Sequence, residues 1–244
     1  MILPRIRASF DRSDAMALVE LLGRADPALR DAALSRLDEA GIDVLLDDPR
    51  TAVALLSEPQ VSLSPQLIFY VLVRHAMLEG GVDDRPTADY LASMLLAFGF
   101  ENRAWRISDD AREEFHYLVD LVARMGEVTD DRDAFLLPAH MGNYALWLTG
   151  MFPDFVESRR HRRGAPSYRY YESMGSAGFR SAAATPLAGK LGIDGLLREV
   201  AASFGRLRMA LNRLSDRHFW RGGGDPVSHL LREMQWRGAE LGEG

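Results

Sequence analysis

The chain has 244 residues, of which 47% are hydrophobic and 26% are charged, and its formal net charge at pH 7 is −6. This length and composition are typical of a globular protein that buries its own core without covalent staples. Cysteine is absent, which excludes disulfides, thiolate nucleophiles and cysteine-ligated zinc or iron–sulfur sites. The lack of cysteine fits a reducing compartment, and the N-terminus has no apolar segment of signal-peptide length. The sequence therefore predicts a soluble, cytoplasmic protein.

Helix-start signals recur through the first half of the chain. An N-capping residue followed directly by proline occurs three times, at Asp26-Pro27, Asp48-Pro49 and Ser64-Pro65. The first and third of these helices are expected to end at Gly41 and Gly80, because glycine is the common residue just past a helix C-terminus. The run 67–73, LIFYVLV, has the content of a buried strand. Its Ser-Pro start and its apolar continuation to Leu78 favour a buried helix.

The second half shows the same signals. Further helices are predicted from 85, over 108–125, from Thr129-Asp130, from Pro153, from Pro166, over 194–220, and from Asp225-Pro226 after a glycine hinge at 222–224. Strict alternation of polar and apolar residues is missing. The prediction is an all-α, compact bundle of about ten helices in a single domain over 1–244, in which 1–60 could form a looser helical subdomain.

Charge is unevenly distributed along the chain. Residues 1–135 carry a net charge of −11, and residues 136–244 carry +5. This asymmetry could favour head-to-tail association or an anionic partner of the C-terminal half. The simpler interpretation, which we favour, is that the two halves pack together. Long amphipathic segments such as 195–220 are also compatible with a homo-oligomer. Lysine occurs once against 28 arginines, a bias typical of a GC-rich genome such as many bacteria have.

A long uncharged segment lies near the middle of the second half. Residues 134–152 contain no formal charge, which meets the length criterion for a membrane-spanning helix. Pro138, His140 and Asn143 interrupt this run, and the last two are costly in lipid without partners. A membrane span is therefore disfavoured. We expect instead a central helix near 131–151 that is apolar on all sides because other helices surround it.

Four residues of this expected helix form one stripe, at i, i+3, i+4 and i+7: His140, Asn143, Tyr144 and Trp147. Once buried, the polar members need hydrogen-bond partners or a cavity. One interpretation is a satisfied structural pair that fixes the helix register. The other is a ligand pocket walled by the two aromatic rings, with His140 and Asn143 as its polar groups. Most buried polar residues are structural, so the first interpretation is favoured.

A basic turn follows this helix. Arg159, Arg160, Arg162 and Arg163 surround His161 at the end of a short helix that begins at Pro153. Positive charge at a helix C-terminus complements the helix dipole, but four arginines exceed what that effect requires. Tyr168 and Tyr171 come shortly afterwards and could be core contacts or partners of the arginines. An anionic small ligand or an acidic patch on a partner protein fits this turn. Nucleic acid is disfavoured, because the protein as a whole is acidic.

Metal ligation has one partial signature. Glu113 and His116 supply a Glu-x-x-His pair of the kind used in di-metal helical bundles, and His75 with Glu79 forms a second His/Glu pair. His140 would be a further candidate. The second Glu-x-x-His is missing, so a metal site is not favoured. P-loop, nucleophile-elbow, HExxH and GxGxxG patterns are also absent.

The sequence therefore predicts a helical protein that binds a partner protein or a small, anionic ligand, with no catalytic residue or cofactor assigned. The expected ligand-binding residues are His140, Asn143, Tyr144, Trp147, Arg159, Arg160, Arg162, Arg163, Tyr168 and Tyr171. Two alternatives stay open. One is a metal-dependent enzyme built on the His/Glu pairs, and the other is a phosphate or nucleic-acid binder that uses the arginine turn at 159–163.

Overall fold

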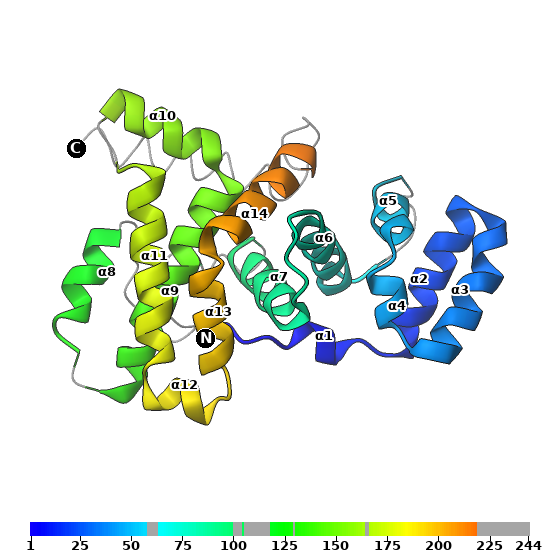
Figure 1. Cartoon of the computed structure of the whole chain (residues 1–244), viewed down its shortest axis with the longest axis horizontal. Helices are drawn as coiled ribbons and strands as arrows, with labels where there is room; N and C mark the ends of the chain where they lie inside the picture. Colours follow the sequence, from blue (N-terminus) through cyan, green and yellow to red (C-terminus); the bar gives the residue numbers. More distant parts are fainter. Residues whose placement is uncertain (58–62, 100–103, 105–117, 129, 164–165, 219–244) are drawn as a thin grey trace. The chain divides into compact units, whose positions relative to one another are not determined.

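The structure is a computed structural model that describes residues 1–57, 63–99, 104, 118–128, 130–163 and 166–218 (Figure 1). Within these ranges it contains fourteen helices and no strand, which confirms the all-α prediction. Its contacts divide the chain into two compact units. We call Ile2–Leu96 the N-terminal unit, and Met1 with Ala97–Gly244 the C-terminal unit. The expectation of a single domain stays a prediction.

The N-terminal unit holds seven helices: α1 (Ile6–Ser9), α2 (Arg12–Ala25), α3 (Pro27–Ala40), α4 (Asp43–Leu46), α5 (Pro49–Ser57), α6 (Pro65–Glu79) and most of α7 (Arg85–Gly99). Side-chain caps stabilise the starts of α2, α3 and α6. The side chain of Asp26 accepts from the amide of Ala28, and that of Ser64 accepts from Leu67, as the sequence predicts. A carboxylate from α7 serves the first turn of α1, since Asp89 Oδ1 accepts from the amides of Ile6 (2.9 Å) and Arg7 (3.1 Å).

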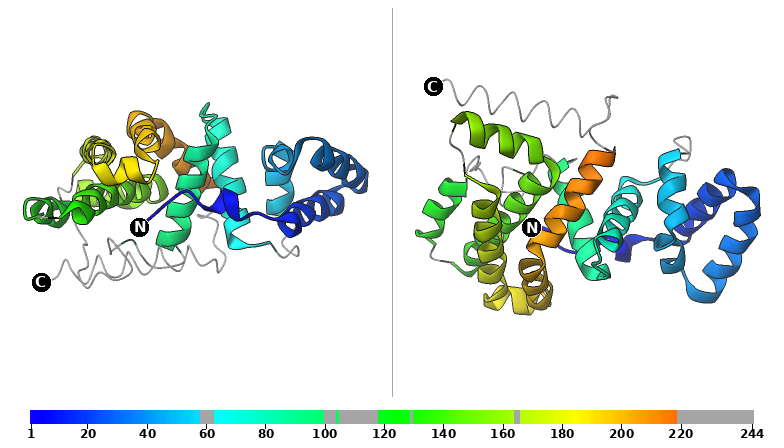
Figure 2. Two further views of the ribbon diagram at one scale, coloured as in Figure 1. Left: turned by 90° about the horizontal axis from the view of Figure 1, so that it is seen from below. Right: turned by 45° about the horizontal axis from the view of Figure 1, so that its top comes forward.

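The C-terminal unit is built around one helix. It contains the end of α7 followed by α8 (Leu118–Met125), α9 (Asp131–Met151), α10 (Pro153–Arg163), α11 (Tyr168–Ala183), α12 (Pro186–Lys190), α13 (Asp194–Ala202) and α14 (Phe204–His218). Helix α9 contacts α8, α10, α11, α12 and α14, and each of its residues from Phe135 to Met151 is buried (Figures 1 and 2). The predicted central helix near 131–151 is thus confirmed.

The apolar character of α9 does not make it a membrane segment by the usual criteria. Among the described residues, none of the helices combines the length and the hydropathy that crossing a membrane requires.

Glycine lets α9 and α11 approach closely. A Cβ atom on Gly178 would stand 2.5 Å from the carbonyl oxygen of Pro138 and 3.0 Å from the amide nitrogen of Gly142. On the facing helix, a Cβ on Gly142 would stand 2.7 Å from the ring of Phe179. Backbone therefore packs directly against backbone here, and a core of normal density leaves no room for another methyl group.

Side chains of α14 complete the C-terminus of α9. The last carbonyls of a helix have no partner within it, and burying them unbonded is costly. The side-chain Nδ2 of Asn212 donates to the carbonyls of Thr149 (2.8 Å) and Gly150 (2.7 Å). The hydroxyl of Ser215 donates to the carbonyl of Met151 (2.7 Å). The packing of α14 on α9 is thus held by polar bonds as well as by apolar burial.

The structure has more helices than the ten expected. Three are single turns or little more, namely α1, α4 and α12, and these are too short to show a helical period. The predicted run over 194–220 is split at Ser203 into α13 and α14. The hydroxyl of Ser203 donates to Glu199 (2.8 Å) and accepts from Arg206 (2.8 Å), so local bonds stabilise the break. The hinge at 222–224, the last predicted helix and the helix start at 108–117 lie outside the described residues.

Candidate functional site

The stripe on α9 is buried and surrounded by rings. His140, Asn143, Tyr144 and Trp147 all belong to the core of the C-terminal unit. Phe98, at the end of α7, lies 5.7 Å from the ring of His140 and 5.4 Å from that of Trp147, measured between centroids. Trp147 also meets Phe152 edge-on at 4.8 Å. The structure therefore gathers the predicted residues in one aromatic cluster. The ligand-binding role of this cluster stays a prediction.

The arginine turn lies at the end of α10, where it was expected. The guanidinium of Arg159 lies over the ring of Phe155, 5.4 Å from its centroid, and Arg160 is exposed. Burial raises the pKa of Tyr171, and the nearby positive charge of Arg159 opposes that rise. Arg159 and Tyr171 therefore lie within electrostatic reach of each other. Arg162 and Arg163 belong to α10, but their side chains lie outside what the structure describes.

Tyr168, the other predicted tyrosine, contacts an arginine of a different helix. The guanidinium of Arg208, on α14, lies over the ring of Tyr168, 5.3 Å from its centroid. Its Nε donates to Glu172 (2.7 Å) and its Nη1 donates to Asn212 (2.9 Å). The hydroxyl of Tyr168 donates to the carbonyl of Pro153 at the start of α10 (2.5 Å). Sequence reasoning missed Arg208, because 40 residues separate it from Tyr168 and no local pattern links them.

We call Arg159, Arg160, Tyr168, Tyr171 and Arg208 the arginine–tyrosine surface. Tyr168 and Tyr171 are three residues apart on α11 and so lie on neighbouring positions of one helix face. Arg208 lies over the ring of Tyr168, and the positive charge of Arg159 acts on Tyr171. Positive charge next to half-exposed aromatic rings can hold an anionic group and stack a planar one.

The structure describes only some of the metal candidates. Within the described ranges, no three His, Asp or Glu side chains are placed to share a metal ion. His75 lies in the N-terminal unit, where its Nε2 is 2.9 Å from the carbonyl oxygen of Leu46, while His140 belongs to the C-terminal unit. Glu79 lies one turn after His75 on α6. Glu113 and His116 lie outside the described residues. The metal hypothesis gains no support from the residues that the structure places.

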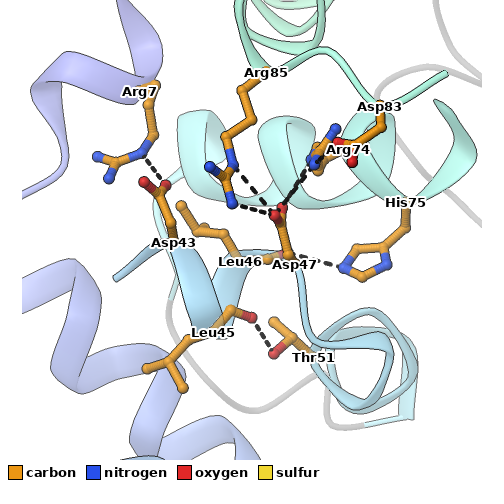
Figure 3. Close-up of polar contacts among 10 residues, drawn as sticks. All are labelled: Arg7, Asp43, Leu45, Leu46, Asp47, Thr51, Arg74, His75, Asp83 and Arg85. Atoms are coloured by element: carbon orange, nitrogen blue, oxygen red, sulfur yellow. Dashed lines mark hydrogen bonds and ion pairs between the residues drawn. The ribbon is translucent and has the colours of Figure 1, made fainter. Parts of the chain in front are cut away.

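An ion-pair cluster in the N-terminal unit was not predicted. Arg74 is only 2% exposed, and its Nε and Nη2 donate to the two carboxylate oxygens of Asp47, at 2.7 and 3.1 Å. Arg74 also bonds Asp83 (2.5 Å), and Arg85 bonds Asp47 (2.6 Å). Figure 3 shows the Asp47 carboxylate between the two guanidinium groups. Beside it, Arg7 bonds Asp43 at 2.7 Å, which ties α1 to α4.

The electrostatics of this cluster indicate a structural role. Burial alone would raise the pKa of Asp47, but hydrogen bonds from Arg74 and Arg85 outweigh it and hold that pKa below its usual value. Burial would lower the pKa of Arg74, and the two aspartates reverse that effect. Each charge is thus stabilised by a partner rather than left available for a ligand. One feature of the sequence indicated this cluster: Arg74 lies inside an apolar helix, and a buried arginine requires an acidic partner.

His75 predicts a pH dependence of stability. Because the Leu46 carbonyl can only accept, Nε2 carries a proton, and burial favours the neutral form of the ring. Burial lowers the pKa of His75, and its hydrogen bond to Leu46 opposes this only in part. The folded pKa is thus below the unfolded value of about 6.5. The stability from neutral His75 is therefore complete above pH 6.5 and is lost as the pH falls towards the folded pKa.

The measurement is the free energy of unfolding in urea at several pH values between 7.5 and 5. The slope due to one histidine can reach about 1.4 kcal/mol per pH unit. In His75→Gln, whose amide can still donate to Leu46 but does not titrate, this part of the slope should disappear. Equal slopes in the two proteins would contradict the assignment.

Comparison with models of protein families, with curated proteins and with solved structures finds no match to this chain.

Proposed function

We propose that the protein is a binding protein that recognises an anionic group, carried by a small ligand or by an acidic patch of a partner protein, through the arginine–tyrosine surface. The observation that carries this proposal is the guanidinium of Arg208 over the ring of Tyr168, 5.3 Å from its centroid, together with the positive charge of Arg159 acting on Tyr171 on the same helix face.

Preorganisation supports the proposal. Arg208 is held over Tyr168 by its ion pair with Glu172 and its bond to Asn212, which fix the shape of this part of the surface. Glu172 already balances the charge of Arg208, so the positive charge offered to a ligand comes from Arg159 and Arg160. Its side chain remains 20% exposed. Arg160, in contrast, is exposed on α10 and adds positive charge at the edge of the same unit. A few arginine charges, rather than a long basic stripe, suit a compact anionic group better than an extended nucleic acid.

Calorimetric titration with two probes tests the proposal. Inorganic pyrophosphate represents a small anion, and poly-L-glutamate represents an acidic protein surface. We expect saturable binding of one of them, with affinity reduced roughly tenfold or more in the double variant Arg159→Gln with Arg160→Gln, since a hydrogen bond to a charged group contributes about 1.5–3 kcal/mol. Higher salt should weaken binding further.

The matched control is Arg180→Gln with Arg198→Gln. It removes two exposed charges from the same unit but outside the arginine–tyrosine surface. An equal loss of affinity in both double variants would mean that only net charge matters. Either that result, or the absence of binding with both probes, would refute the proposed function.

A further inference from the structure

The N-terminal unit has a hollow between α2 and the start of α3. Its volume is about 560 Å³. Eight residues line it: Ser13, Met16, Ala17, Val19, Glu20, Gly23, Arg24 and Arg30. All but Arg30 belong to α2, and most of these recur at spacings of three and four residues, which places them on one helix face. The hollow is therefore formed by one face of α2 and by the side chain of Arg30.

The sequence builds this hollow with small residues. Ala17 leaves space on the α2 surface. At Gly23, an added Cβ would stand 2.9 Å from Cβ and 3.2 Å from Cγ of Arg30. The missing side chain at Gly23 therefore lets the aliphatic stem of Arg30 lie directly against the α2 backbone. Arg30 is thereby brought into the lining of the hollow, and its side chain is exposed.

The floor and the rim of the hollow differ in chemistry. Val19 is fully buried, so the apolar surface that a ligand could meet comes from Met16, which is 37% exposed, and from the partly exposed Ala17. Of the two cations at the rim, Arg24 is already paired with Glu20 at 2.8 Å. Arg30 makes no ion pair with any residue that the structure describes. The hollow thus combines an apolar floor with one uncommitted positive charge.

We propose that this hollow binds a small amphipathic carboxylate, whose short apolar body covers Met16 and Ala17 and whose carboxylate pairs with Arg30. The volume lies within the range of roughly 300–1,000 Å³ that is typical of small-molecule sites. The lining is too small for a stable protein interface, which needs about 20–30 residues on each side. This site lies in the N-terminal unit and is independent of the arginine–tyrosine surface.

Methyl NMR on the full chain, with labelled methionine and octanoate as the probe, tests the site. The signal of Met16, assigned by its loss in Met16→Leu, should shift and saturate as octanoate is added. The signal of Met209, which is 44% exposed in the C-terminal unit, should stay in place. Octanol and octylammonium have the same chain without the carboxylate, and we expect each to shift Met16 at least about fivefold more weakly at equal concentration.

Two variants separate a built site from general adsorption. Arg30→Gln should weaken octanoate binding by about fivefold or more, whereas Arg5→Gln, which removes an exposed arginine of the same unit outside the hollow, should leave it unchanged. The proposal is overturned if Met16 fails to shift, if octanol matches octanoate, if Met209 responds equally, or if Arg30→Gln binds as the parent does. None of these outcomes depends on pyrophosphate or poly-L-glutamate binding, so the proposal and the proposed function can fail separately.

Discussion

Replacing Gly178 by alanine is expected to destabilise the C-terminal unit by roughly 3 kcal/mol or more, because overpacking typically costs 1–3 kcal/mol and here the clash is with backbone. The new methyl group would stand 2.5 Å from the Pro138 carbonyl oxygen and 3.0 Å from the Gly142 amide nitrogen. Neither atom is the end of a flexible side chain, so α9 and α11 would have to separate. Unfolding in urea, followed by circular dichroism, measures the loss.

Gly195→Ala is the matched control. Gly195 lies in the first turn of α13, and an added Cβ there would meet nothing within 4 Å. Alanine has a higher helix propensity than glycine, so this variant should be unchanged or up to about 1 kcal/mol more stable. If Gly178→Ala proved as stable as Gly195→Ala, the close contact between α9 and α11 would be wrong.

The second large effect is expected in the ion-pair cluster of Figure 3. Asp47→Asn removes the carboxylate that serves Arg74, which is 2% exposed, and leaves it with Asp83 alone. A buried charge that loses its partner typically costs 3–5 kcal/mol, so we expect a loss of about 3 kcal/mol. Arg74→Met removes the same ion pair but replaces the charge by an apolar side chain that is shorter and of comparable volume. It should cost about 1 kcal/mol or less.

The order of the two variants is the diagnostic result. In Arg74→Met, the remaining carboxylate of Asp47 keeps its bond to Arg85 at 2.6 Å. Glu20→Gln, which removes an exposed pair with Arg24, sets the scale for a surface ion pair and should cost less than about 1 kcal/mol. A larger loss in Arg74→Met than in Asp47→Asn would mean that the ion pair itself, rather than the cost of an unpaired buried charge, controls stability.

Features that depend on a few neighbouring residues could be predicted from the sequence. Asp130 caps α9, as its position before an apolar run indicates. Pro153 starts α10 and Ser64 caps α6, again where the predicted signals fall. These features follow from the unbonded amides of a first helical turn, which only nearby side chains can satisfy. The uncharged run, with Pro138, His140 and Asn143 inside it, likewise predicted a central, surrounded helix rather than a membrane span.

Features that depend on distant partners could not be predicted. Arg74 is recognisable in the sequence as a charge inside an apolar helix. Its partner Asp47 lies 27 residues earlier, and several neighbouring acidic residues could equally have paired with it. Arg208 completes the arginine–tyrosine surface from a helix that was expected to be one long amphipathic run. The hollow on α2 depends on Gly23, whose significance appears only when Arg30 is seen against it. In each case, chain folding and not local pattern creates the proximity.

The bonds between α14 and the end of α9 have a consequence for how the C-terminal unit folds. Asn212 and Ser215 lie 62 to 64 residues after the carbonyls that they satisfy. During synthesis, α9 is therefore made well before the side chains that complete it. Until α14 arrives, water must serve those carbonyls, and the end of α9 cannot be buried without cost. The core of this unit should consequently close in one late, cooperative step that requires α14, and not grow helix by helix from α9 onwards.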